Sequence, residues 1–169
     1  MFWAILRIAP SAAEPCTEND LVAIVVSRRA AKTIQRELRL YSDVETGGVL
    51  FGLKIGCFWI VFCVSSSGKR SIRSAASFQA DIEELAQEAQ QILNNSMIPM
   101  KVLGIWHKHN HNYSPLFSTE DEVTNFEYAQ LNSFGAISLL ASKDIDGYSY
   151  YAVHVSTNNC YTDERLLGL

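Results

Sequence analysis

The chain has 169 residues, of which 48% are hydrophobic and 19% are charged, with a net charge of -4. This length and composition are typical of one globular domain with a substantial core, and they exclude a disordered chain. The sequence has no long basic block and no apolar run of membrane-spanning length, so we expect no binding to nucleic acid or membrane. The four cysteines form no CxxC pair, and a chain of this size does not need disulfides. We therefore expect free thiols in a cytoplasmic protein.

The first 20 residues are expected to form an N-terminal strand or arm followed by a connector, and residues 21–169 to form the main domain. Residues 1–8 are apolar, but they lack a preceding basic region and are too short for a convincing signal peptide. Residues 9–20 hold two prolines and several small or polar residues, which is typical of a connector.

The first half of the main domain alternates between strand and helix patterns. Residues 21–26 predict a strand, and Ser27 then caps a helix through Leu40. Residues 49–52 and 57–64 predict a hairpin around a turn at 54–56, and residues 71–79 are assigned to extended structure. Residues 81–93 carry one apolar stripe at helical spacing, which predicts an amphipathic helix.

In the second half, residues 100–106 predict a strand and residues 118–132 a helix. Residues 136–141 and 148–155 predict two strands joined by a hairpin turn at Asp146-Gly147. Helices interspersed with strands indicate an α/β or α+β fold, and the short turns favour a mixed or antiparallel sheet sandwiched by helices.

Two histidines follow directly at the end of the strand predicted at residues 100–106, in the stretch Trp106-His107-Lys108-His109. Side chains two residues apart on a strand share a face, so both imidazoles can point at one spot. Asp121 lies in the first turn of the next helix. Two histidines and one aspartate are a ligand set that zinc accepts, with a fourth position left open. The sequence therefore predicts a catalytic zinc site made of His107, His109 and Asp121.

Glu45 is the candidate general base. It precedes Gly47-Gly48 at the entrance to an apolar strand, and this glycine pair would let the backbone approach the site closely. A carboxylate beside a hydrolytic metal site can take a proton from water and later pass it to the leaving amine.

Each of these features also has a simpler interpretation. Ser118 and Asp121 have the Ser-x-x-acid spacing of a helix N-cap. Histidines two apart on a strand are often half-exposed polar residues, and His154 is interpreted as structural. His111 adds a further imidazole that could approach the metal. Only the combination of acid-Thr-Gly-Gly, H-x-H and S-x-x-D is specific.

That combination resembles the signature of the JAMM (JAB/MPN) metalloproteases, which is an upstream Glu, then H-x-H, a short spacer and S-x-x-D. The matching segments here are Glu45, His107-Lys108-His109 and Ser118-Thr119-Glu120-Asp121, and the resemblance spans roughly residues 21–155.

The chain departs from the usual family pattern near the second histidine. Asn110 stands where many members have proline, and Lys108 stands where a small polar residue is frequent. The spacer from residue 110 to residue 117 is one residue longer than is common. None of these changes removes a ligand.

The resemblance implies a compact α/β sandwich of the JAB/MPN type, with layering similar to that of cytidine deaminases. It implies zinc bound by His107, His109 and Asp121, with Glu45 as general acid/base and Ser118 helping to bind the oxyanion. Family members remove ubiquitin or ubiquitin-like proteins from lysine side chains or from C-terminal extensions. Short bacterial members serve conjugation-like pathways, including antiphage defence, so E1-like and E2-like enzymes are expected partners.

Two alternatives stay open at this point. The same site would suit a zinc peptidase that acts on a sulfur-carrier protein or a small peptide. A non-catalytic scaffold of this fold is the alternative from a different class, and its mark would be a missing ligand or a missing Glu, which this sequence does not show. A zinc nucleoside deaminase is excluded because its His-x-Glu and Pro-Cys-x-x-Cys pattern is absent.

Overall fold

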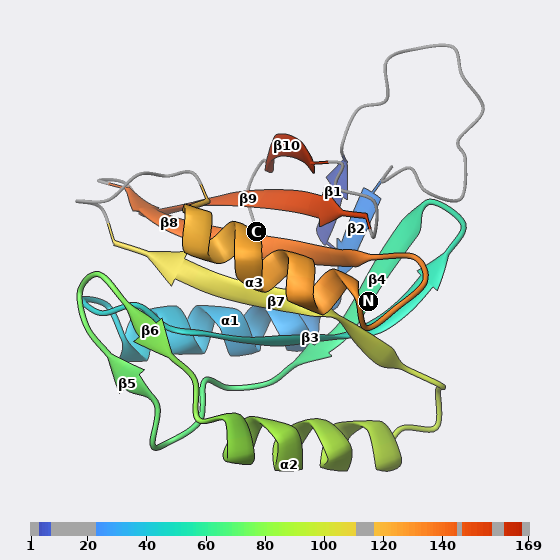
Figure 1. The fold of residues 1–169 in the computed structure, drawn as a ribbon, viewed down its shortest axis with the longest axis horizontal. Helices are drawn as coiled ribbons and strands as arrows, with labels where there is room; N and C mark the ends of the chain where they lie inside the picture. The colour runs from blue at the N-terminus through green and yellow to red at the C-terminus, as the bar shows by residue number, and fades with distance from the viewer. Residues whose placement is uncertain (1–3, 8–22, 111–116, 145–146, 157–160, 167–169) are drawn as a thin grey trace.

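The computed structural model describes residues 4–7, 23–110, 117–144, 147–156 and 161–166, and within them eight strands form one mixed sheet with helices on both faces (Figure 1). The β2–β4 and β7–β8 pairs are parallel and the other neighbours are antiparallel. The expected mixed α/β architecture is therefore confirmed. The strands in spatial order are β1 (Ala4–Arg7), β2 (Ala23–Val26), β4 (Phe58–Val64), β3 (Gly47–Ile55), β7 (Lys101–His109), β8 (Ala136–Asp144), β9 (Gly147–Val155) and β10 (Tyr161–Leu166).

Each of the three helices begins at a residue whose side chain accepts a backbone hydrogen bond. Ser27 caps α1 (Arg28–Leu40), Asp81 caps α2 (Ile82–Asn94) and Ser118 caps α3 (Thr119–Ala129). Such caps satisfy amides that have no partner in the first turn. The predicted helix starts are confirmed, whereas α3 ends three residues before the predicted end at residue 132.

Helix α1 packs on one face of the sheet, and α2 and α3 pack on the other. Leu50 of β3 belongs to the same apolar cluster as Ile34 of α1, whereas the neighbouring Phe51 packs with Leu85 of α2. Tyr128 of α3 contacts the α2 side as well. Because successive strand residues point to opposite faces, this alternation separates the two layers. Figure 1 shows α3 in front of β7 and β8, with α1 behind the strands.

The segment assigned to extended structure at residues 71–79 is a small separate hairpin. Its strands β5 (Ile72–Arg73) and β6 (Phe78–Gln79) pair with each other and not with the large sheet. The expectation of extended structure is confirmed only in part, because residues 74–77 turn between the two strands.

Three further expectations can be compared with the structure residue by residue. Strand β7 continues through His109, three residues beyond the predicted end. Cys57 is disulfide-bonded, so the expectation of free thiols is wrong for this residue, while Cys63 is a free thiol. Residues 4–7 form the expected N-terminal strand and pair with β2. The connector at residues 9–20, His111 and Asp146 lie outside the described residues.

No helix among the described residues is long and apolar enough to cross a membrane.

Candidate metal centre

Strand β7 carries both candidate histidines on one face of the sheet. His107 and His109 alternate with Trp106 and Lys108, which point to the α1 side. Both imidazoles are buried, at 8% and 7% exposure. Their Nε2 atoms lie 3.2 Å apart and their ring centroids 4.9 Å apart. The strand spacing thus brings both rings to one place, as the sequence predicts.

Asp121 completes a cluster of three side chains of the types that bind metal ions. Its Oδ1 lies 3.1 Å from His107 Nε2, and its Oδ2 lies 3.3 Å from His109 Nε2. One ligand atom from each residue falls within 4.8 Å of the others, so the group could hold a metal ion. The structure therefore brings together the three residues that the sequence assigns to one site.

The same aspartate closes the capping box that begins α3. Ser118 Oγ accepts a hydrogen bond from the Asp121 amide at 3.2 Å, and the Ser118 amide donates to Asp121 Oδ2 at 2.7 Å. Ser118 Oγ also donates to Oδ2 at 2.8 Å. The helix-cap and metal-ligand interpretations are therefore compatible, because the cap fixes the carboxylate in the orientation that faces the histidines.

The charge state of Asp121 suits a ligand. Burial acts to raise its pKa, but hydrogen bonds from His107 and His109, the charge of His107 and the hydrogen bond from the Ser118 amide outweigh burial, so the pKa lies well below the usual range. The carboxylate is therefore ionised at neutral pH, which is the form that binds a metal.

Glu45 lines the same cleft as the three ligand-type residues. Burial raises its pKa above the ordinary value of 4.5, against the opposing charge of His109. Its backbone amide donates to the Ser74 carbonyl at 2.8 Å, which links it to the β5–β6 hairpin. A half-buried carboxyl with a raised pKa is suited to accept and return a proton.

The glycine pair next to Glu45 allows β3 to approach its neighbours closely. A Cβ at Gly47 would lie 2.6 Å from the Trp106 carbonyl oxygen, and a Cβ at Gly48 would lie 2.6 Å from the Ser65 carbonyl oxygen. Neither distance is tolerated by a side chain. Because Gly47 pairs directly with His107 in the sheet, the close approach expected at this pair is confirmed.

The cluster lies in a cleft of about 770 Å³. Residues 76–80 and the start of α2 form one part of its lining, and α3 forms another. Phe78, Phe117 and Tyr128 contribute bulky side chains, and Glu120 and Glu127 contribute carboxylates. This volume lies within the range of ligand-binding clefts, which is about 300–1,000 Å³.

Lys108 points away from this cleft into the protein and is 0% exposed. Its Nζ donates to the carbonyl oxygens of Tyr41 at 2.6 Å, Ser42 at 2.8 Å and Val44 at 2.8 Å. These carbonyls belong to the segment that joins α1 to β3 and carries Glu45. Burial lowers the pKa of Lys108 to about 8. The lysine between the two histidines therefore anchors the segment that presents the candidate base.

Asn110 reinforces the same segment from the end of β7. Its Nδ2 donates to the Asp43 carbonyl at 3.3 Å and to the Ala75 carbonyl at 2.7 Å, and the residue is 5% exposed. A proline at this position could make neither bond. Asn110 thus joins the α1–β3 segment to the β5–β6 hairpin, which also lines the cleft.

The sequence did not reveal these positioning roles of Lys108 and Asn110. One signal was available, because alternation along β7 puts residue 108 on the face opposite to the histidines. A buried ammonium group there must find hydrogen-bond acceptors. Which carbonyls accept could not be known without the tertiary structure.

Comparison with known proteins adds information on the fold alone. No family model and no curated protein matches the chain. Among solved structures, the chain is similar to a structural genomics target from Desulfitobacterium hafniense determined in solution, with a TM-score of 0.61 and 18% identity over 82% of this chain and 88% of that protein. At this identity, the likeness supports a shared mixed α+β fold.

Proposed function

We propose that this chain is a zinc metallopeptidase of the JAMM type, which hydrolyses a peptide or isopeptide bond after the C-terminal tail of a ubiquitin-like protein. The observation that carries the proposal is the spacing of the ligand atoms. Four ligands placed tetrahedrally at about 2.0 Å from zinc lie roughly 3.3 Å from one another. The two imidazole Nε2 atoms lie 3.2 Å apart, close to this value, and each faces a different oxygen of Asp121, at 3.1 Å for His107 and 3.3 Å for His109. With one ligand atom from each residue, the three atoms lie within 4.8 Å of one another. The donor types and this close grouping support zinc, with three protein ligands as in catalytic centres.

The residues around the centre suit hydrolysis of an amide bond. A zinc ion held by His107, His109 and Asp121 would supply Lewis acidity and would lower the pKa of a bound water to about 7. Glu45 takes the proton from the attacking water and delivers it to the leaving amine, which its raised pKa favours. Ser118 lines the cleft, and its hydroxyl, which donates to Asp121 Oδ2 in this structure, turns to donate to the oxyanion of the tetrahedral intermediate.

The cleft suits an extended, small-residue tail. Strand β6 borders it, so a tail can lie alongside with main-chain hydrogen bonds supplying much of the affinity. Bulky lining residues such as Phe78 and Phe117 favour small residues at the reacting end of the substrate. A ubiquitin-like tail has this character, and E1-like or E2-like enzymes of a cytoplasmic conjugation pathway would be the accompanying partners.

Metal content tests the centre directly. Protein purified without chelator is expected to contain one zinc per chain by elemental analysis. His107→Ala and Asp121→Asn are expected to lose zinc, because each removes a ligand, while Glu120→Gln beside the site keeps it. Full zinc retention by both ligand variants would overturn the assignment.

Turnover tests the reaction. The substrates are a β-grasp protein ending in two glycines, fused to a reporter by a peptide bond or joined to a lysine peptide by an isopeptide bond. The zinc-loaded protein should cleave at least one, and Glu45→Gln should cleave neither while keeping its zinc. Cleavage of short peptides alone would instead indicate the sulfur-carrier or small-peptide alternative, and no cleavage of any of them would indicate a scaffold.

A further inference from the structure

Helix α1 has a strongly basic outer face, although the whole chain carries a net charge of -4. The helix holds five of the 14 basic residues of the chain and a single acidic residue, Glu37, which is buried at 4% exposure. All five basic residues are exposed. They are Arg28, Arg29, Lys32, Arg36 and Arg39.

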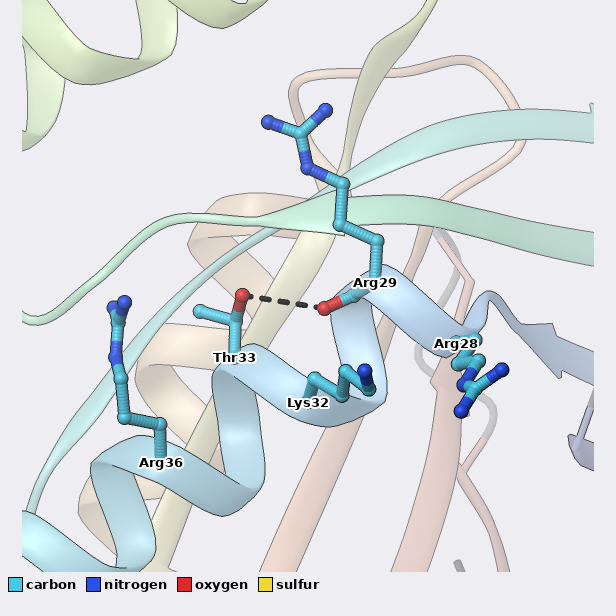
Figure 2. A pocket seen from close by; sticks show the side chains of 5 residues that line it. All are labelled: Arg28, Arg29, Lys32, Thr33 and Arg36. Atoms are coloured by element: carbon cyan, nitrogen blue, oxygen red, sulfur yellow. Dashed lines mark hydrogen bonds between the residues drawn. The ribbon is translucent and has the colours of Figure 1, made fainter.

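Four of these cations surround an open hollow of about 550 Å³, together with Thr33. In Figure 2, Arg29 and Arg36 extend from the same side of the helix, with Thr33 between them. The Thr33 hydroxyl donates to the Arg29 carbonyl at 3.2 Å, and the side chain is uncharged. We call this set (Arg28, Arg29, Lys32, Thr33 and Arg36) the basic face.

The basic face is unfavourable for the helix that carries it. Arg28 and Arg29 lie in the first turn, where the helix dipole disfavours cations and where α1 has no acidic residue. Lys32 is one turn from both Arg28 and Arg36, and like charges at this spacing cost about 0.2–0.5 kcal/mol per pair. The charges therefore do not stabilise α1, whose stability comes from its buried stripe of Ala30, Ile34 and Leu38.

The charged residues of α2 behave differently. Glu84 accepts from the Lys69 amide at 2.6 Å, and Glu88 accepts from Ser66 Oγ at 3.1 Å. On α1, by contrast, Arg36 to Glu37 at 3.4 Å is the one ion pair found within the described part of the chain. The carboxylates Glu84 and Glu88 of α2 thus bind other groups of the same chain, whereas the cationic side chains of α1 are exposed to solvent.

We propose that the basic face binds an acidic segment of a partner protein. The Cβ atoms of residues one helical turn apart lie about 5–6 Å from one another, so the cations project from the helix at the same spacing as carboxylates one turn apart on a partner helix. Three of the four cations are arginines, whose planar guanidinium groups bind carboxylates through two hydrogen bonds.

The charge distribution favours this partner over nucleic acid. The hollow is lined by cations and one threonine, so it offers no aromatic ring on which a base could stack. The negative charge of the chain as a whole repels a long polyanion, while a short acidic segment interacts mainly with the local cations.

The position of α1 leaves the metal cleft free. Helix α1 packs on the sheet face opposite to α2 and α3, which line the cleft. Exposed carboxylates such as Glu120 and Glu127 line the cleft side and repel an acidic segment. The partner is therefore directed to α1, and the protein can hold it and a substrate at the same time.

Fluorescence anisotropy with a labelled poly-glutamate peptide tests the proposal on the full chain. At about 0.15 M ionic strength, where the screening length is about 8 Å, the peptide is expected to bind one-to-one. The double variant Arg29→Glu/Lys32→Glu should weaken binding roughly tenfold or more, since it replaces two attractions with two repulsions. The matched control Lys69→Glu/Lys101→Glu changes the net charge equally at exposed sites on other elements and should bind as the unmodified protein does.

Three outcomes of the binding experiments would overturn the proposal. They are absence of saturable peptide binding, equal loss of binding in both double variants, and tighter binding of a DNA duplex than of the peptide. Light scattering in low salt tests whether a second copy of the chain binds the basic face instead. Self-association that the α1 variant abolishes would mean that the basic face binds the acidic cleft side of another copy, and would likewise overturn it. Arg36→Gln provides a milder variant if the charge reversal reduces the melting temperature.

Discussion

The ammonium group of Lys108 lies 2.6 Å from the carbonyl oxygen of Tyr41, a residue 67 positions earlier in the chain. This contact ties the strand that carries both histidines to the end of α1. From Tyr41 the chain continues to Glu45 within four residues. One buried side chain therefore relates the candidate base to the candidate ligands.

Lys108→Met tests that relationship. The substitution leaves the carbonyls of Tyr41 and Val44 without this donor, and we expect a loss of about 2 kcal/mol in the free energy of unfolding by urea. We also expect lower kcat with zinc retained, because Glu45 loses its anchor. Lys143→Met is the control, since Lys143 donates to Ser42 at 3.0 Å from a partly exposed position and should cost less. Unchanged stability and kcat in Lys108→Met would contradict the anchoring role.

Glu45→Gln is expected to stabilise the metal-free protein at neutral pH and to abolish turnover by the zinc-loaded protein. Burial raises the pKa of Glu45 in the folded state above its ordinary 4.5, so the folded protein binds more protons than the unfolded chain between these two values. Stability of the unmodified protein therefore falls as pH rises through this window, and the penalty is fully present above the folded-state pKa. Gln carries no such penalty.

Melting curves taken across pH check this expectation. The advantage of Glu45→Gln should shrink as pH is lowered and vanish below about 4.5, where Glu45 is protonated in both states. Glu120→Gln serves as the control, since Glu120 is exposed in the first turn of α3 and its loss should not stabilise the protein. A Glu45→Gln advantage that is independent of pH would contradict the burial explanation.

Two substitutions of Ser118 separate its structural and chemical roles. Ser118→Ala removes the helix cap and should cost about 1 kcal/mol, whereas Ser118→Gly should cost only a few tenths because glycine is tolerated at this position. Both variants lack the hydroxyl. If that hydroxyl stabilises the oxyanion, both should lose about a hundredfold or more in kcat despite their different stabilities. Rate losses that follow stability instead would mean that Ser118 acts only as a cap.

Gly104 is expected to tolerate no side chain. Its φ is +142°, and an added Cβ would lie 1.9 Å from the Ile137 carbonyl oxygen in the parallel neighbour β8. Gly56 also has a positive φ of +57°, but nothing lies within 4 Å of its Cβ position. Gly56→Ala should therefore cost roughly 1–2 kcal/mol from backbone strain alone, and Gly104→Ala clearly more. Equal losses in urea unfolding would show that β7 and β8 can move apart.

Local signals predicted much of this structure. Ser27, Asp81 and Ser118 mark the starts of the helices because their side-chain oxygens satisfy first-turn amides. Alternation along one strand was enough to place His107 and His109 together.

Contacts between distant segments could not be predicted in the same way. The place of β7 between β3 and β8, and the contact of Lys108 with Tyr41, depend on how the chain packs over tens of residues. Neither has a sequence pattern of its own. The sequence predicts too early an end for β7, because polar residues usually end a strand. Here His107 and Lys108 continue the strand, and both side chains are buried.

The alternation along β7 makes the centre sensitive to chain length in one particular way. Cleft-facing imidazoles and the core-facing ammonium group occupy successive positions of the strand. Deleting Trp106 would exchange the two sets, placing the rings against the apolar layer under α1 and the cation on the cleft side that holds Asp121. A substitution in this strand changes one side chain at a time. A single-residue insertion or deletion would instead displace both histidines and the Lys108 ammonium group at once.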